Sequence, residues 1–232
     1  MAEERRSKKE SWVTSFVLVL PLMIGYVAGI ILLGPKMVNG ADVINPFILS
    51  QLGFYGLLGF NLALIALCLF LISYLKKRDR FDPKRFLPTI LESSFYAVTM
   101  GSFIIFVMKQ TTLIAMGTSD RPPPLEGLVI SLGAGVNEEL FFRVGLLGAL
   151  AYLGEDLLGL KKGSAVVMAI ILSSVAFSLA HYLGAEEFQG ITFVYRCLAG
   201  VIFSVVYKFR SFAIAVYTHT LYDIMVLVVP SP

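Results

Sequence analysis

Two adjacent carboxylates, Glu138 and Glu139, lie in the middle of an apolar stretch long enough to cross a membrane, and Arg143 follows four residues later. A charge at the centre of a bilayer costs about 2.5–3.5 kcal/mol on insertion scales. The only two histidines of the chain, His181 and His219, also lie inside apolar stretches. Polar groups in such costly positions predict partners or water around them, and they mark the candidate functional residues of this chain.

These residue types together could hydrolyse an amide bond. A glutamate among apolar walls suits a general base near neutral pH, and an imidazole can hydrogen-bond the same water and carry its proton. A second imidazole that donates a hydrogen bond can stabilise an oxyanion. Water would then be the nucleophile, and no covalent intermediate would form.

Other hydrolytic chemistries have less support. The chain has no G-x-S-x-G elbow for a serine nucleophile and no HExxH zinc motif, and neither Cys68 nor Cys197 shares a segment with a histidine. A carboxylate and two imidazoles could also bind a divalent metal, so metal-dependent hydrolysis stays open at this point.

Helical spacing predicts which of these side chains meet. Residues four apart lie on one helix face, so Glu139 and Arg143 can pair within their own helix. Glu138 is turned by about 100° from Glu139 on an α-helix and should point to a different neighbour.

The remaining polar groups come from three further apolar segments. Phe177 and His181 share one helix face, His219 and Asp223 share another, and Arg196 lies between them in the chain. By the segment boundaries, His181 lies near the outer edge of the membrane and the two glutamates at its middle. We expect all these groups to converge on one hydrated pocket inside the bundle.

Composition predicts an integral membrane protein. The chain is 57% hydrophobic and 15% charged, with a mean hydropathy of +0.80, whereas soluble domains carry about 25% charged residues. A spanning helix needs about 20 apolar residues. Seven apolar stretches reach that length, and we expect them at residues 12–34, 48–75, 88–108, 125–153, 163–183, 188–207 and 211–229.

These runs lack the alternating pattern of barrel strands, so the predicted fold is all-α. Residues 1–232 would form a single polytopic transmembrane helical bundle. The third segment could extend to Met116 or contain a break, and eight spans are the alternative.

Basic residues predict the orientation of the bundle. Most of them precede the first stretch or follow the second, fourth and sixth stretches, which would place all these segments on one side. The positive-inside rule then puts the amino terminus in the cytoplasm. The formal net charge of +3 therefore reports topology, and we do not predict nucleic-acid binding. The residues concerned are Arg5, Arg6, Lys8, Lys9, Lys76, Lys77, Arg78, Arg80, Lys84, Arg85, Lys161, Lys162, Lys208 and Arg210.

Three short motifs, in this order and separation, resemble the CAAX prenyl protease type II family, also called the Abi or CPBP family. The resemblance covers roughly residues 125–227, and the first three spans match only in being hydrophobic. The motifs are EExxxR at Glu138–Arg143, FxxxH at Phe177–His181, and HxxxN at His219–Asp223, where Asp223 replaces the asparagine.

The resemblance implies a glutamate-type intramembrane endopeptidase without metal or cofactor. It implies that Glu138 and His181 activate water, and that His219 and, imperfectly, Asp223 form the oxyanion hole. Glu139 and Arg143 would be supporting or substrate-orienting residues. The substrate would be a membrane-associated peptide or lipidated protein, with prenylated CAAX proteins as one class. Bacterial members of the family also act in peptide maturation and in bacteriocin self-immunity.

Asp223 leaves two alternatives open. An ionised aspartate cannot donate a hydrogen bond to an oxyanion, so the chain could be a non-catalytic membrane partner or an immunity protein on the same fold. Buried carboxylates and histidines also form proton relays, which would suit a proton-coupled transporter.

Overall fold

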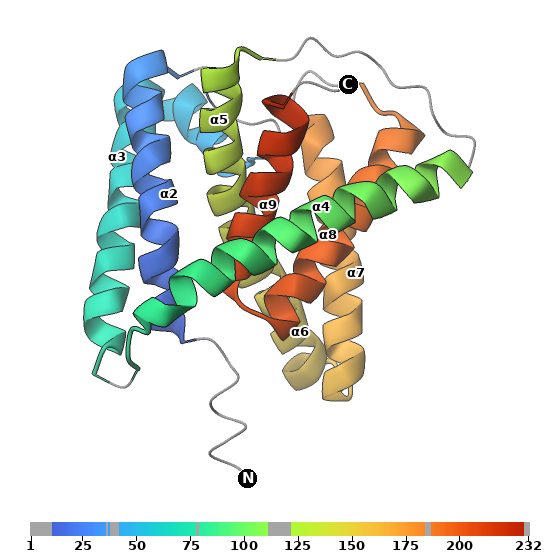
Figure 1. The fold of residues 1–232 in the computed structure, drawn as a ribbon. Coiled ribbons are helices and arrows are strands. Elements are labelled where there is room, and N and C mark those ends of the chain that lie inside the picture. Colours follow the sequence, from blue (N-terminus) through green and yellow to red (C-terminus); the bar gives the residue numbers. More distant parts are fainter. Residues whose placement is uncertain are drawn as a thin grey trace.

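The computed structural model describes residues 11–35, 37, 42–77, 79–110, 122–183 and 187–229. Within these residues the chain is helical and contains no strand, so the predicted all-α class is confirmed. Figure 1 shows a bundle of helices running roughly side by side, with one long helix lying obliquely across it.

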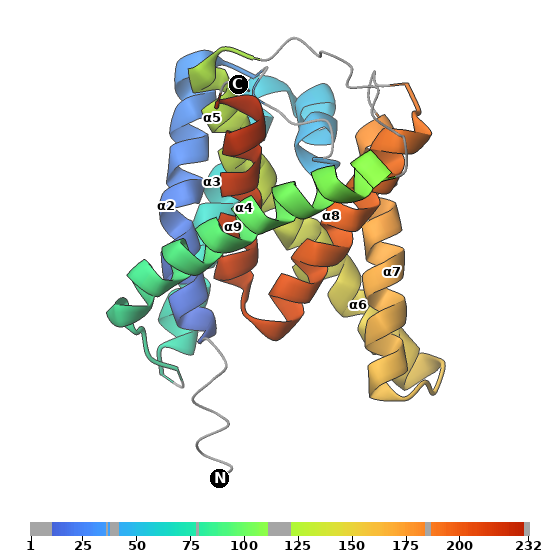
Figure 2. The ribbon, with the colours of Figure 1, turned by 45° about the vertical axis from the view of Figure 1, so that its right-hand side comes forward.

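The first two described helices form an antiparallel pair along one side of the bundle (Figures 1 and 2). Helix α2 spans Trp12–Leu33, and its amino end is capped by Ser11, whose Oγ accepts a hydrogen bond from the Thr14 amide at 3.1 Å. Helix α3 spans Ile44–Leu75 and is kinked at Gly53. The φ angle of Gly53 is 65°, a conformation that residues with a Cβ rarely adopt.

A short 3₁₀ turn, η1 (Pro83–Arg85), leads into α4 (Phe86–Gln110), the oblique helix of Figure 1. The chain then follows one helical path through four elements. These are α5 (Pro124–Gly133), the π-helix η2 (Ala134–Leu147), α6 (Gly148–Tyr152) and a second π-helical turn, η3 (Leu153–Leu157).

The last third of the chain supplies α7 (Lys162–Ala180), the 3₁₀ turn η4 (His181–Leu183), α8 (Gly190–Phe209) and α9 (Phe212–Leu227). Helix α9 is the central element: every residue from Phe212 to Thr220 is buried. It contacts α2, α4, α5, η2 and α8. A polar residue between Phe212 and Thr220 is therefore surrounded by protein.

In the part of the chain that the structure describes, four helical segments are long and apolar enough to cross a membrane, namely α2, α3, α7 continued by η4, and α8, and α9 is a shorter apolar helix. They indicate an integral membrane protein. Each of the seven predicted segments coincides with helix, but the number of spans stays a prediction. The proposed extension of the third segment to Met116 lies outside the described residues.

The basic segments that are described gather at one end of the bundle. The end of α3, the start of α7 and the turn between α8 and α9 all lie at the lower end of Figures 1 and 2. This agrees with a shared side for these segments, and the side that faces the cytoplasm stays a prediction. Arg5, Arg6, Lys8, Lys9 and Arg78 lie outside the described residues.

Candidate active site

The π-helix η2 carries the acid pair into the interior. Glu138, Glu139 and Arg143 are each no more than 1% exposed. A π-helix bonds i to i+5, and such turns occur frequently at functional sites. Gly135 lets η2 approach α9 closely, because a Cβ at this position would lie 2.0 Å from Oγ1 of Thr220 and 3.0 Å from its amide nitrogen. The residue before Thr220 is His219.

His219 lies between the two glutamates. Its Nδ1 is 2.8 Å from Oε1 of Glu139, and its Nε2 is 3.8 Å from Oε2 of Glu138. The prediction that Glu138 points to a different neighbour from Glu139 was wrong. The reason is the π-helix: a wider turn rotates each residue by less than the 100° of an α-helix, so adjacent side chains can reach one imidazole.

Arg143 holds the second oxygen of Glu139. Its Nε lies 3.3 Å from Oε2 of Glu139, so the pairing expected from the spacing is present. Its Nη2 donates to the Gly200 carbonyl on α8 at 3.4 Å. The guanidinium also lies over two aromatic rings, 4.5 Å from the centroid of Phe177 and 5.4 Å from that of Phe203. Both oxygens of Glu139 thus face a positive or hydrogen-bonding partner, which supports a structural role for Glu139.

Two phenylalanines fix the imidazoles. Phe203 stacks on His219, with ring centroids 4.3 Å apart and planes inclined by 15°. Phe177 meets His181 edge-on at 5.0 Å and His219 at 6.0 Å. The sequence reasoning found Phe177 through its spacing to His181, but it missed Phe203. Nothing in the apolar run around Phe203 distinguishes it from its neighbours.

Both histidines line one small cavity, of about 180 Å³. Arg196 and Asp223 also line it, and the rings of phenylalanines and tyrosines form much of the remaining wall. The Nδ1 of His181 lies 2.9 Å from the Phe177 carbonyl, which can only accept, so Nδ1 carries a hydrogen. In the neutral ring Nε2 is then the unprotonated nitrogen, which is able to accept a proton.

The structure therefore brings His181, His219 and Asp223 to one cavity. Oδ2 of Asp223 lies 3.5 Å from Nε2 of His219, on the nitrogen that also faces Glu138. Glu138 is not among the residues that line the cavity and lies next to it, against His219. Since α7 starts at the basic end of the bundle and His181 follows its last residue, the cavity lies towards the opposite end (Figure 1).

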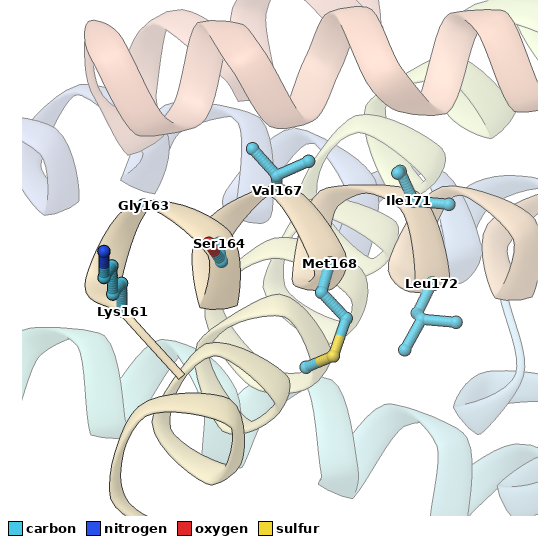
Figure 3. Close-up of a pocket in the computed structure, with 7 residues that line it drawn as sticks. All are labelled: Lys161, Gly163, Ser164, Val167, Met168, Ile171 and Leu172. Carbon is cyan, nitrogen blue, oxygen red and sulfur yellow. The ribbon is translucent and has the colours of Figure 1, made fainter. Parts of the chain in front are cut away.

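A larger hollow of about 820 Å³ lies along the outer face of α7 (Figure 3). Its lining is apolar apart from Lys161 and Ser164 and includes no acid or histidine. His181, His219 and Asp223 line the smaller cavity instead. Among the described residues, no three or more His, Cys, Asp or Glu side chains are arranged to hold a metal ion.

Comparison with known proteins identifies the second half of the chain. Residues 120–225 match the family model described as Type II CAAX prenyl endopeptidase Rce1-like. We call residues 120–225 the Rce1-like domain because of this similarity. The resemblance drawn from the three motifs is thereby confirmed, and the Rce1-like domain contains the acid pair, both histidines and Asp223. No curated protein and no solved structure matches the chain significantly.

Proposed function

We propose that this protein is an intramembrane endopeptidase in which Glu138 and His181 activate a water molecule without a metal ion. The observation that supports this most directly is the position of His219. It touches both glutamates and lines the same cavity as His181, although the two histidines come from different helices. One imidazole is thus available as a hydrogen-bond donor and the other as a proton acceptor around a single space.

The proposed reaction starts with attack of water on the scissile carbonyl carbon. Glu138 and His181 take up the proton of that water as the new C–O bond forms. The carbonyl oxygen becomes an oxyanion and accepts a hydrogen bond from a protonated Nε2 of His219. When the tetrahedral intermediate collapses, the C–N bond breaks and the retained proton passes to the leaving amine. The products are an amine and a carboxylic acid, and the acid then releases the second proton of the water to become a carboxylate.

Glu139 and Arg143 support this arrangement without touching the substrate. Glu139 engages Nδ1 of His219 and thereby turns Nε2 towards Glu138 and Asp223. Arg143 and Phe203 hold Glu139 and the imidazole plane in place. An oriented donor of this kind is effective because it does not reorganise during the reaction.

The family assignment points to a membrane-associated peptide or lipidated protein as the substrate. The aromatic walls of the cavity, formed by Phe177, Tyr195, Phe203 and Tyr222, suit an extended peptide with apolar side chains. A prenylated CAAX-type peptide is the first substrate class to test.

The test uses the full chain in detergent or liposomes and a fluorogenic CAAX-type peptide, with and without a farnesyl group. We expect cleavage that survives chelator and is lost in Glu138→Ala and in His181→Ala. Glu155→Gln is the matched control, because Glu155 is an exposed acid on the same helical path. Unchanged cleavage in a folded Glu138→Ala variant would refute the proposal. Proton-dependent flux without proteolysis would favour the transporter alternative.

A further inference from the structure

A second buried polar cluster lies beside the acid pair, and it comes from the part of the chain that precedes the Rce1-like domain. Asp42, Asn45 and Asn61 are 4%, 0% and 4% exposed, and Asn137 on η2 is 9% exposed. Asp42 and the α3 residues lie outside residues 120–225. The reaction proposed above uses none of these side chains, although Asn137 immediately precedes Glu138.

Asp42 is the acceptor at the centre of this cluster. Its Oδ1 accepts from the backbone amides of Ile44 and Asn45 at 3.2 and 3.0 Å. Its Oδ2 accepts from two side-chain amides, those of Asn45 and, at 3.3 Å, of Asn137. One carboxylate therefore caps the start of α3 with one oxygen and holds η2 with the other.

Asn61 extends the cluster along α3 through Asn45. Oδ1 of Asn45 accepts from Nδ2 of Asn61 at 2.9 Å, and the same Asn61 group also donates to the Leu57 carbonyl. Tyr26 on α2 packs against Gly133, the last residue of α5 before η2 begins, where a Cβ would lie 2.4 Å from the tyrosine ring. The α2–α3 pair is thus attached to the helical path that carries the acids.

We propose that Asp42 is a positioning residue for Glu138 and acts through the side-chain amide of Asn137. This proposal rests on the proposed function, because its expected effect on kcat presupposes peptidase activity. Breaking this contact would be costly because it is buried. A buried polar group without a hydrogen-bond partner keeps the full free-energy cost of its desolvation, whereas a surface group can bond to water. Asn137 immediately precedes Glu138 on the π-helix. Its hydrogen bond to Asp42 would therefore fix the direction in which the helix presents the Glu138 carboxylate.

The substitution Asp42→Asn separates positioning from packing. An asparagine keeps the size of the side chain and can keep the oxygen that caps α3. It presents an NH₂ group to the amides of Asn45 and Asn137, so donors face donors, and even if the Asn137 amide turns over, the charge-assisted link to η2 is lost. Asn137→Ala removes the same link from the other side. Asn61→Ala is the control, because Asn61 belongs to the cluster but does not contact Asn137.

We expect Asp42→Asn and Asn137→Ala each to lower kcat by up to about a hundredfold with little change in KM, as small displacements of catalytic groups do. The double variant should be no slower than the slower single variant, because both changes remove one contact. Asn61→Ala should lower the melting temperature and leave kcat unchanged. Additive losses, or a kcat for Asp42→Asn equal to that of the wild type, would overturn the proposal.

A readout independent of proteolysis keeps the two proposals apart. A hydrophobic carbodiimide labels buried carboxyl groups, and mass spectrometry gives the labelling of Glu138 relative to Glu139 in one peptide. We expect this ratio to change in Asp42→Asn and Asn137→Ala and to stay constant in Asn61→Ala. If the wild type cleaves no peptide, the proposed function fails and the ratio still decides the role of Asp42. A constant ratio in all three variants refutes that role.

Discussion

Nδ1 of His219 and Oε1 of Glu139 lie 2.8 Å apart, a contact between two side chains that are separated by 80 positions and almost wholly buried. Through it the central helix α9 is joined to the π-helix η2 at the depth of the acid pair. The contact also determines which nitrogen of His219 faces Glu138. The geometry of the candidate site therefore depends on Glu139, and Glu139 depends on Arg143.

The substitution Arg143→Met should destabilise the protein strongly. It leaves Glu139 buried with only His219 as partner, and removing one member of a buried ion pair costs about 3–5 kcal/mol. Adding Glu139→Gln removes the uncompensated charge, so the double variant should be more stable than Arg143→Met alone. Denaturation in detergent followed by circular dichroism measures both. A double variant that loses the full sum of the two single effects would show that the pair is not coupled.

A single methyl group at Gly135 should disrupt the site. The Cβ of Gly135→Ala would lie 2.0 Å from Oγ1 of Thr220 and 3.0 Å from the carbonyl oxygen of Val216, so α9 must move away from η2. We expect a lower melting temperature and loss of peptidase activity.

Gly148→Ala is the matched control for this prediction. Gly148 begins α6 on the same helical path, and its Cβ would meet nothing within 4 Å. Because alanine is a better helix former than glycine by about 0.8–1.0 kcal/mol, this variant should be slightly more stable and fully active. Equal losses in both variants would mean that the close approach of η2 to α9 is unimportant.

The sequence was sufficient for the features that depend on residue type and short spacing. Hydropathy predicted the helices, and four-residue spacing predicted the pairs Glu139–Arg143 and His219–Asp223. The π-helix could not be predicted, because nothing in the residue types of Ala134–Leu147 separates a π-helix from an α-helix. This is also why the orientation of Glu138 was predicted wrongly. Contacts across helices, such as Phe203 on His219, leave no periodic signal in an apolar run.

The basic end of the bundle should be cytoplasmic. Lys77 and Lys162 lie at that end, and Glu187 lies beyond α7 at the other end. All three positions are exposed, so each can be replaced by a single cysteine. In a background with Cys68 and Cys197 replaced, a membrane-impermeant thiol reagent added to intact cells should label only the Glu187→Cys variant. The reverse pattern would contradict the positive-inside assignment, and labelling of both ends would indicate a different number of spans.

The substitution Asp223→Asn should keep or raise peptidase activity. Oδ2 of Asp223 lies 3.5 Å from Nε2 of His219, beside the cavity where the oxyanion would form. An ionised aspartate there repels the oxyanion, whereas an asparagine presents an NH₂ group that can donate to it, as the family motif implies. A donor in such a position is worth about 2.7–4 kcal/mol in an oxyanion hole. The measurement is kcat at several pH values. Loss of turnover in a folded Asp223→Asn protein would instead assign Asp223 to proton transfer, and the oxyanion-hole role proposed for this residue would have to be abandoned.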